Sequence, residues 1–247
     1  MLELRKMRRL HTLPVVLVLV VAVSALSSIS LFSEAARSAF DDPAANPWAA
    51  LLLTYTLMSA MGSPVLVAVL ASRQTDIEHS SSGWILAATA GYLPGMVCRA
   101  KLVVLGLVIT PAAIAQSLLV VAAGYVAGIR VPLDLGPWIG YTVLLVLVDI
   151  ALCALHIWLA TVVENQLISV GVGMLGAFVA VFTLFLSPVG ARFIPWGYYA
   201  VISFATQSGD QASYTQPPYL WVGGFLVLIG AVFAVVTRRL DRLEGQQ

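Results

Sequence analysis

Six stretches of apolar residues, each roughly 18 residues long or longer, recur along this chain of 247 residues. A helix of about 20 residues crosses the roughly 30 Å of hydrocarbon in a bilayer, so each stretch can span a membrane. The stretches lie near residues 13–32, 49–71, 102–127, 138–162, 167–187 and 219–236. Hydrophobic residues make up 60% of the chain and charged residues only 10%. The sequence therefore predicts an all-α polytopic membrane protein, with a single domain over residues 1–247.

Positive charges indicate how these helices are oriented. If alternate loops lie on opposite sides of the membrane, ten of the 13 Lys and Arg residues share one side, in both chain ends and the segment between spans two and three. The other three, Arg37, Arg130 and Arg192, lie on the opposite side. Because cytoplasmic loops are enriched in Lys and Arg, we expect both termini in the cytoplasm. The net charge of only +1 gives no reason to expect a nucleic-acid partner.

The chain lacks the common sequence motifs of catalysis. Neither the P-loop pattern of nucleotide-binding proteins nor the H-E-x-x-H and G-x-S-x-G signatures of hydrolases occur. The two cysteines, Cys98 and Cys153, do not have the spacing of a metal site, and we expect no disulfide between them in a reducing cytoplasm. We therefore expect no enzyme activity, no metal and no cofactor bound by this chain itself.

Three polar or ionisable side chains fall inside the fourth predicted span. Asp149, Cys153 and His156 are spaced so that all three share one face of a helix. Ionisable groups in hydrocarbon are costly, so this face should point into the bundle or into a wet cavity. One interpretation is a proton relay or a substrate contact, and the other is a hydrogen bond from each group to a neighbouring helix. We favour the second, because a proton-coupled carrier usually has more intramembrane charges.

The segment from Ser72 to Lys101, between spans two and three, is too amphipathic for a plain connector. A polar stretch leads through Ser-Ser-Ser-Gly into Trp84 and an apolar run, and a second break containing Gly and Pro follows. We predict a short amphipathic helix over residues 78–90, lying flat at the cytoplasmic membrane interface, with residues 91–95 as its hinge. Such a helix either anchors the bundle or provides a protruding surface that a cytosolic partner can bind. The residues favour neither interpretation.

The longest external loop runs from Ser187 to Pro218. Its Pro, Gly and Ser residues predict irregular structure with short helical pieces. Trp196, Tyr198 and Tyr199 in this loop are typical of a belt of aromatic side chains at the outer membrane surface. A belt of this kind is compatible with a contact between the same residues and a substrate.

Parts of this pattern resemble a known family. Glu78, then Gly83-Trp84-x-Leu86, a break, and Lys101 at the start of the third span resemble the inner loop of ABC-2 type transporter permeases. Six spans with both ends inside are similar to that family too. Where the family usually has a proline and an arginine in the turn, this chain has Gly91 and Pro94. Downstream, Glu164-Asn165-Gln166 and Pro195-Trp196-Gly197-Tyr198-Tyr199 look like the permease subunits of lantibiotic and related bacteriocin-immunity transporters.

This resemblance implies the permease subunit of an ATP-driven exporter in a bacterial cytoplasmic membrane. Two permease chains, identical or paralogous, would assemble among the membrane lipids with a separate cytosolic ATPase that binds ATP and Mg²⁺. The substrate would be a lantibiotic-like antimicrobial peptide or a hydrophobic drug, expelled from the membrane to confer immunity or resistance. One alternative is an ATP-independent, proton-coupled small-molecule transporter that uses Asp149 and His156. Another is a membrane scaffold or sensor subunit that transports nothing.

The resemblance also assigns roles to particular residues. Coupling to the ATPase is expected of Glu78, His79, Ser80, Gly83, Trp84 and Leu86. A hinge beside them is expected at Gly91, Pro94 and Gly95. A substrate path or outer interface is expected at Pro195, Trp196, Tyr198 and Tyr199.

Overall fold

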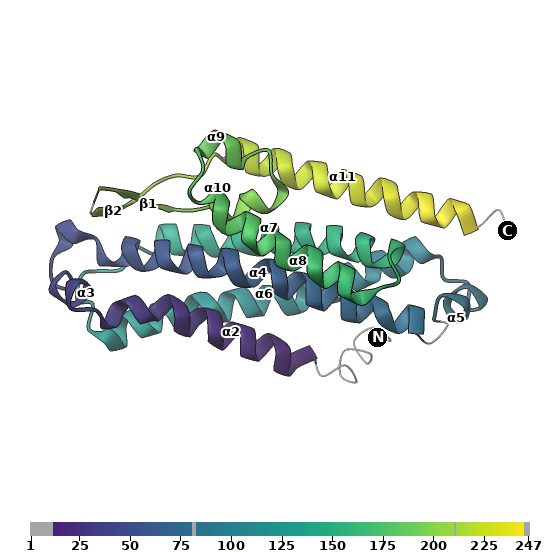
Figure 1. Cartoon of the computed structure of the whole chain (residues 1–247), viewed down its shortest axis with the longest axis horizontal. Coiled ribbons are helices and arrows are strands. Elements are labelled where there is room, and N and C mark those ends of the chain that lie inside the picture. The colour runs from purple at the N-terminus through teal and green to yellow at the C-terminus, as the bar shows by residue number, and fades with distance from the viewer. Residues whose placement is uncertain (1–11, 81–82, 210, 245–247) are drawn as a thin grey trace.

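The structure is a computed structural model, and it describes residues 12–80, 83–209 and 211–244. Within these residues, six helices are long and apolar enough to cross a membrane. In chain order they are α2 (Thr12–Ser28), α4 (Pro47–Ser80), α6 (Pro94–Ala127), α7 (Leu135–Val162), α8 (Gln166–Thr183) and α11 (Tyr219–Glu244). Figure 1 shows them running along one common long axis. This arrangement confirms the predicted all-α membrane fold with six spans.

Short elements connect the long helices. They are η1 (Ile29–Phe32), α3 (Glu34–Ser38), η2 (Pro43–Ala45), α5 (Gly83–Thr89), α9 (Pro188–Ala191), η3 (Pro195–Gly197), α10 (Tyr198–Val201), β1 (Ala205–Ser208) and β2 (Gln211–Tyr214). The two strands form an antiparallel hairpin in which Ala205 pairs with Tyr214 and Ser208 with Gln211. We call the end of the bundle that carries α3 and this hairpin the hairpin end, and the opposite end the α5 end (Figure 1). The basic residues Arg5, Lys6, Arg8 and Arg9, which support the predicted orientation, lie outside the described residues.

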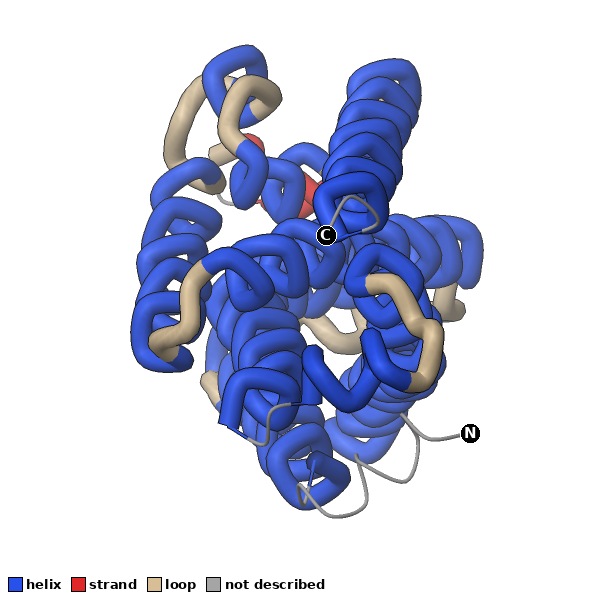
Figure 2. Tube along the Cα trace, turned by 90° about the vertical axis from the view of Figure 1, so that its right-hand side faces the viewer, coloured by secondary structure: helices blue, strands red, loops and turns tan. Residues whose placement is uncertain are grey.

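The core of the bundle surrounds α4, which contacts α2, α6, α7 and α8. Large aromatic side chains fill its hairpin half. The ring of Tyr55 stacks on Trp138 with centroids 6.2 Å apart, and it meets Tyr141 edge-on at 5.4 Å. By contrast, α8 and α11 lie at the periphery (Figures 1 and 2) and expose large apolar side chains such as Phe178, Phe182 and Leu228. Exposed apolar side chains on a spanning helix are suited to contact with lipid.

Local sequence signals explain where several helices begin. The side chain of Asp134 accepts a hydrogen bond from the backbone N–H of Gly136 and caps α7, and Asn165 caps α8 through the N–H of Leu167. Pro47 and Pro94 are the first residues of α4 and α6. Proline suits that position because the first turn of a helix has no intrahelical partner for the missing N–H group.

The structure corrects several predicted boundaries. The second span was predicted to end at residue 71 and the third to begin at residue 102, but α4 continues to Ser80 and α6 begins at Pro94. The polar residues that follow Ala71 contain neither Gly nor Pro, so they continue the helix, and several of them are buried against the bundle. At the other end, α8 stops at Thr183 rather than at residue 187, and α11 runs past residue 236 into its charged end.

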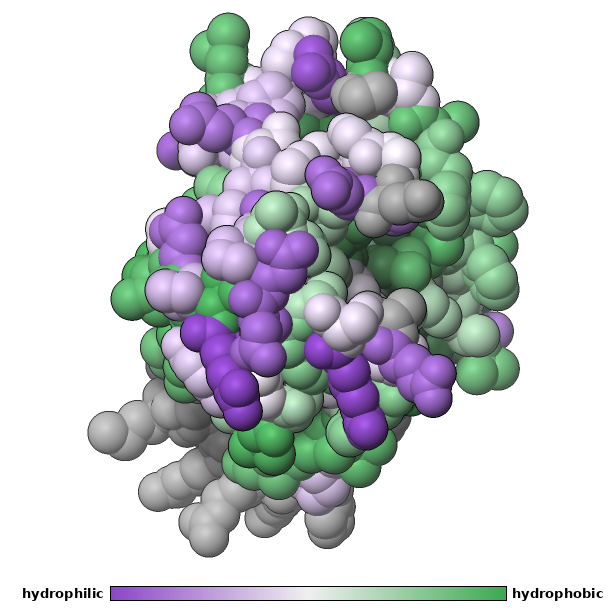
Figure 3. Space-filling view, turned by 90° about the vertical axis from the view of Figure 1, so that its left-hand side faces the viewer, coloured by the Kyte–Doolittle hydropathy of each residue, from purple (hydrophilic) through white to green (hydrophobic). Residues whose placement is uncertain are grey.

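The loop from Ser187 to Pro218 is more regular than predicted. Short helices were expected there and are present, whereas the hairpin of β1 and β2 was not predicted. Its strands have only four residues each, and the turn between them uses Gly209 at a φ of +63°. Glycine accepts this left-handed backbone conformation without steric cost. Figure 3 looks onto the hairpin end, where hydrophilic residues gather on the end face between hydrophobic flanks.

Candidate functional site

A buried ion pair joins α4 to α6 at the α5 end. Lys101 Nζ donates a hydrogen bond of 2.8 Å to Glu78 Oε1 and a second of 2.7 Å to the backbone carbonyl oxygen of Gln74. The side chain of Lys101 is fully buried, and that of Glu78 is only 3% exposed. Removing two charges from water is costly, and their mutual attraction and additional hydrogen bonds offset that cost. The pair therefore fixes the relative position of α4 and α6 as long as both charges are present.

The first residue of α5 packs directly against this ion pair. A Cβ atom placed on Gly83 would collide with a carboxylate oxygen of Glu78 and would lie 2.9 Å from the Glu78 Cα atom. Glycine, which has no Cβ, is the residue that permits this approach. The position of α5 is thus coupled to the side chain that pairs α4 with α6.

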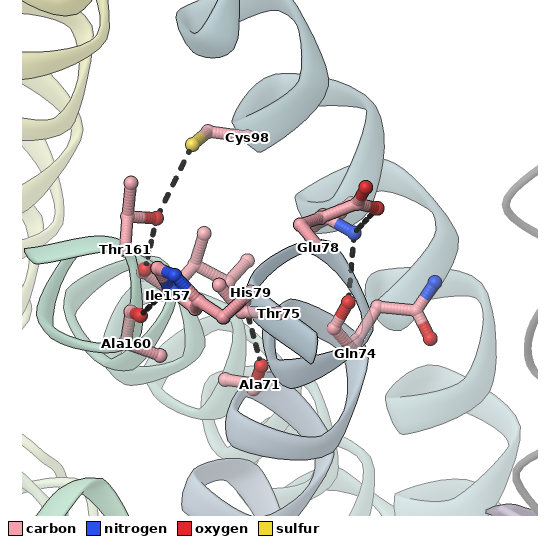
Figure 4. Close-up of polar contacts among 10 residues, drawn as sticks. Ala71, Gln74, Thr75, Glu78, His79, Cys98, Ile157, Ala160 and Thr161 are labelled. Atoms are coloured by element: carbon pink, nitrogen blue, oxygen red, sulfur yellow. Dashed lines mark hydrogen bonds and ion pairs between the residues drawn. The ribbon is translucent and has the colours of Figure 1, made fainter. Parts of the chain in front are cut away.

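A second contact joins α5 to α4 and α7. The Nε2 atom of His79 lies 3.0 Å from the carbonyl oxygen of Ala160, so α4 and α7 are bridged next to the ion pair (Figure 4). The ring of His79 also meets Trp84 of α5 edge-on, with centroids 5.9 Å apart. Close by, Cys98 Sγ lies 3.5 Å from Thr161 Oγ1, which links α6 to α7 (Figure 4). The α5 end is therefore a polar junction of helices α4, α6 and α7, with α5 seated on it.

The outward side of α5 and of the turn after it is apolar. The side chain of Leu86 is 65% exposed, and Tyr92 in the turn and Met96 in the first turn of α6 are about half exposed. This surface differs from the lipid-facing sides of the spanning helices, because it lies at an end of the bundle beyond the junction (Figures 1 and 2). An exposed apolar cluster in that position is suited to contact with a second protein.

The predicted coupling residues fall on two helices rather than one. The expected helix over residues 78–90 is wrong in its extent, because Glu78, His79 and Ser80 form the last turn of α4 and α5 begins only at Gly83. The side chain of Ser80 and residues 81 and 82 lie outside the described part of the chain. Glu78, Gly83, His79 and Trp84 nevertheless meet at one junction, and Leu86 is exposed beside it.

The predicted hinge over residues 91–95 interrupts the helices only in its first part. Gly91 lies in the turn after α5 with a φ of +79°, a conformation that favours glycine. Pro94 and Gly95, in contrast, belong to the first turn of α6. Gly95 packs so closely on the backbone carbonyl of Thr237 in α11 that a Cβ atom would collide with it. Arg99 strengthens the same contact by donating hydrogen bonds of 3.1 Å to Thr237 and 2.9 Å to Asp241.

A second polar cluster lies in the middle of the bundle, around α7. Asp149 is buried and accepts a hydrogen bond of 2.7 Å from the hydroxyl group of Tyr199 in α10. Burial, together with the nearby Asp149 carboxyl group, raises the pKa of Tyr199 well above its usual value, so the phenol remains protonated and acts as the donor. The hydrogen bond supports the interpretation that Asp149 is a structural group.

His156 and Cys153 share the buried face of α7 with Asp149, as the spacing predicts. Neither ring nitrogen of His156 has a hydrogen-bond partner among the described residues. The ring lies 6.4 Å, centroid to centroid, from the indole of Trp196. The polar residues of α7 and the aromatic residues of the loop from Ser187 to Pro218, which no sequence pattern connects, therefore meet inside the bundle.

The aromatic belt predicted at the outer membrane surface is not formed by the tyrosines. Tyr198 and Tyr199 are both buried, and Tyr198 stacks on Phe225 of α11 with ring centroids 3.9 Å apart. Trp196 also points inward, because a Cβ atom on Gly176 of α8 would collide with its indole. The loop folds back onto the bundle because these rings bury more apolar area there than at its surface. Pro195 begins η3 and lines a groove beside α11.

Two pairings at the α5 end were not predicted from the sequence, Lys101 with Glu78 and Arg99 with Asp241. Lys101 was counted as a topological charge and as a residue of the family pattern, but its pairing with Glu78 was not predicted. Its position directly before the third apolar stretch was the available signal, because a lysine that close to the span needs a buried partner if the helix extends past it. Arg99 and Asp241, which join α6 to α11, lie 142 residues apart, and no local pattern connects them.

The bundle of six apolar helices defines a multi-pass membrane protein, with a buried polar junction at one end. The chain belongs to the ABC-2 transporter family, because the family model described as ABC-2 family transporter protein matches residues 1–180. Members of this family are membrane subunits of transporters that have no ATPase site of their own and typically pair with a cytosolic ATPase. No curated protein and no solved structure matches the chain. The matched residues include Glu78 and Lys101, and the Pro195–Tyr199 string lies beyond them.

Proposed function

We propose that this chain is the permease subunit of an ATP-driven exporter in a bacterial cytoplasmic membrane, with its α5 end in the cytoplasm. The junction of Glu78, Lys101 and Gly83 is the observation that carries this proposal. A cytosolic ATPase that binds α5 would act on α4, α6 and α7 together, because all three helices meet at that junction. ATP and Mg²⁺ would be bound by the ATPase, and a second permease chain, identical or paralogous, would complete the transporter.

A cavity near the hairpin end supports a membrane-derived, amphipathic substrate. Its volume is about 710 Å³, and its lining combines apolar side chains such as Leu53 and Leu57 with polar ones such as Thr54, Gln207 and Thr215. Cavities that hold drug-sized ligands have comparable volumes, so this cavity has room for a hydrophobic drug or for a few residues of a peptide. We infer that the substrate is a lantibiotic-like antimicrobial peptide or a hydrophobic drug, taken from the membrane and released on the outer side. Such export would confer immunity or resistance on the cell.

The coupling role is tested by association with the ATPase. The full chain is purified with the P-loop ATPase that accompanies it from its source cells, and Leu86→Ser is compared with the unchanged chain. Leu86 is 65% exposed, so its substitution leaves the fold intact, and we expect loss of most of the bound ATPase. Leu135→Ser at the hairpin end, where the side chain is 59% exposed, is the matched control and should retain the ATPase. Equal retention by both variants would refute coupling through α5.

Proton-coupled transport without ATP is the second candidate. The observation that favours it is the ring of His156, which has no hydrogen-bond partner in the part of the chain that the structure describes. In that case Asp149→Asn and His156→Gln would abolish transport of the peptide or drug into inverted vesicles under a proton gradient without ATP. The ATP-driven function predicts uptake only with the ATPase and ATP present. It also predicts that Asp149→Asn, which preserves the acceptor for Tyr199, leaves that uptake intact.

A further inference from the structure

An apolar groove lies between α11 and the segment that follows α9. Its volume is about 570 Å³, and its walls include Phe193, Ile194 and Pro195 on one side and Leu220, Phe225 and Leu228 on the other. Phe193 meets Trp221 edge-on at 5.8 Å between ring centroids, so the two sides of the groove are in contact there. Figure 1 shows α9 and α10 beside the first half of α11. The groove therefore runs along a helix that spans the membrane.

The groove opens toward the hydrocarbon of the bilayer. Phe193 is 72% exposed, Leu220 88% and Leu228 60%, and all three lie along its rim. Large apolar side chains exposed on a spanning helix contact acyl chains, so a lipid reaches this groove without crossing water. The shape and the apolar lining suit a hydrocarbon chain.

Arg192 is the one cation among the described residues that line this apolar groove. Arg192 lines both the groove and the neighbouring cavity at the hairpin end. Its guanidinium carbon lies 5.5 Å from the centre of the Trp221 ring. Its Nε atom is buried and has no hydrogen-bond partner among the described residues, and no carboxylate of those residues pairs with it. A guanidinium with unused donors is the preferred protein partner of a phosphate group.

We propose that the groove binds an anionic phospholipid, with the phosphate on Arg192 and one acyl chain along α11 between Trp221 and Leu228. The lipid supplies the negative charge that the described residues do not provide, and its acyl chain covers the apolar walls. A neutral or cationic amphiphile would leave the guanidinium unpaired in an apolar setting, which is costly. Anionic lipid is therefore bound in preference to zwitterionic lipid of the same chain length.

The test uses the fluorescence of Trp221 as a local probe. The full chain is placed in nanodiscs of phosphatidylcholine with increasing fractions of phosphatidylglycerol brominated on its acyl chains, which quenches nearby tryptophans on contact. The same titration uses brominated phosphatidylcholine in unbrominated phosphatidylglycerol. The quenching of Trp221 is the difference between the unchanged chain and Trp221→Phe, which preserves an aromatic ring over Arg192. We expect half-maximal quenching at a mole fraction about fivefold lower for phosphatidylglycerol, the gain typical of one basic residue near anionic lipid.

Arg192→Gln should abolish this preference, so that both lipids quench equally, and Arg192→Lys should preserve most of it. The matched control is Arg130→Gln, which removes an exposed arginine from the loop between α6 and α7, outside the groove. This variant should retain the fivefold preference. A preference that survives Arg192→Gln would overturn the proposal. So would the absence of Trp221 quenching by either lipid, which would show that a second copy or another protein covers the groove, or loss of the preference in millimolar inorganic phosphate, which would assign the site to a free anion.

Discussion

Glu78 and Lys101 lie on opposite sides of the segment that contains α5, and their side chains meet at 2.8 Å in a buried ion pair. The segment between α4 and α6 leaves the bundle at Ser80 and returns at Pro94. The ion pair of Glu78 and Lys101 holds the two ends of this segment together. Because Gly83 contacts the Glu78 carboxylate, α5 packs against the ion pair itself. The relationship explains how a seven-residue helix is held in a defined place.

The ion pair predicts a large asymmetry between single and double substitutions. Glu78→Gln leaves Lys101 as an uncompensated buried charge, and we expect a loss of about 3–5 kcal/mol in the free energy of unfolding. Combining Glu78→Gln with Lys101→Met removes both charges and should restore most of that stability. Thermal unfolding of the detergent-solubilised chain, followed by size-exclusion fluorescence, measures both. Additive losses in the double variant would show that the two charges do not interact.

Glycines in α8 provide a test of close packing with a control in the same helix. A Cβ atom on Gly173 would collide with Ala68 of α4, whereas one on Gly171 meets no described atom within 4 Å. We expect Gly173→Ala to destabilise the bundle by about 1–3 kcal/mol through overpacking. Gly171→Ala should be neutral or stabilising by up to about 1 kcal/mol, because alanine favours the helix. Equal melting temperatures for the two variants would contradict the observed packing of α8 on α4.

The hydrogen bond between Tyr199 and Asp149 predicts that the hydroxyl group is structurally important. Tyr199→Phe leaves the buried carboxyl group without this donor, and we expect a cost of about 1–3 kcal/mol in stability. Tyr198→Phe is the matched control, because its hydroxyl makes only a 3.3 Å contact with the carbonyl of Trp221. Thermal unfolding of both variants should show the larger shift for Tyr199. A larger loss of stability for Tyr198→Phe would contradict a stabilising role of the hydrogen bond between Tyr199 and Asp149.

The orientation of the chain is testable with single cysteines. Cys98 and Cys153 are at most 1% exposed, so the unchanged chain should react little with a membrane-impermeant maleimide. Leu86→Cys at the α5 end should be labelled only after the cells are permeabilised, since we propose that this end faces the cytoplasm. Ser208→Cys, at the exposed end of β1 next to the hairpin turn, should be labelled in intact cells. The opposite labelling pattern would invert the proposed topology.

The spanning helices could be predicted because a run of apolar residues determines a membrane helix almost locally. Their exact ends could not, since Gln74 was placed beyond the second span and Glu78 at the start of a separate short helix. Only the buried contacts of Lys101 with both residues explain why they belong to α4. Asp149 and His156 were correctly placed on one buried face by helical spacing. Their neighbours Tyr199 and Trp196 come from a distant loop, and no periodicity in the sequence indicates that this loop folds into the bundle.

The unbroken length of α4 has a mechanical consequence. Its 34 residues form a rod of about 51 Å, longer than the hydrocarbon it crosses. One end of this rod carries the acid that holds α5, and near the other end Leu53 and Leu57 form part of the wall of the cavity. Pro64 lies between these two ends and removes one helix hydrogen bond, so α4 can bend there. We therefore expect a partner that displaces α5 to change the width of that cavity through α4 itself, with Pro64 as the point of bending.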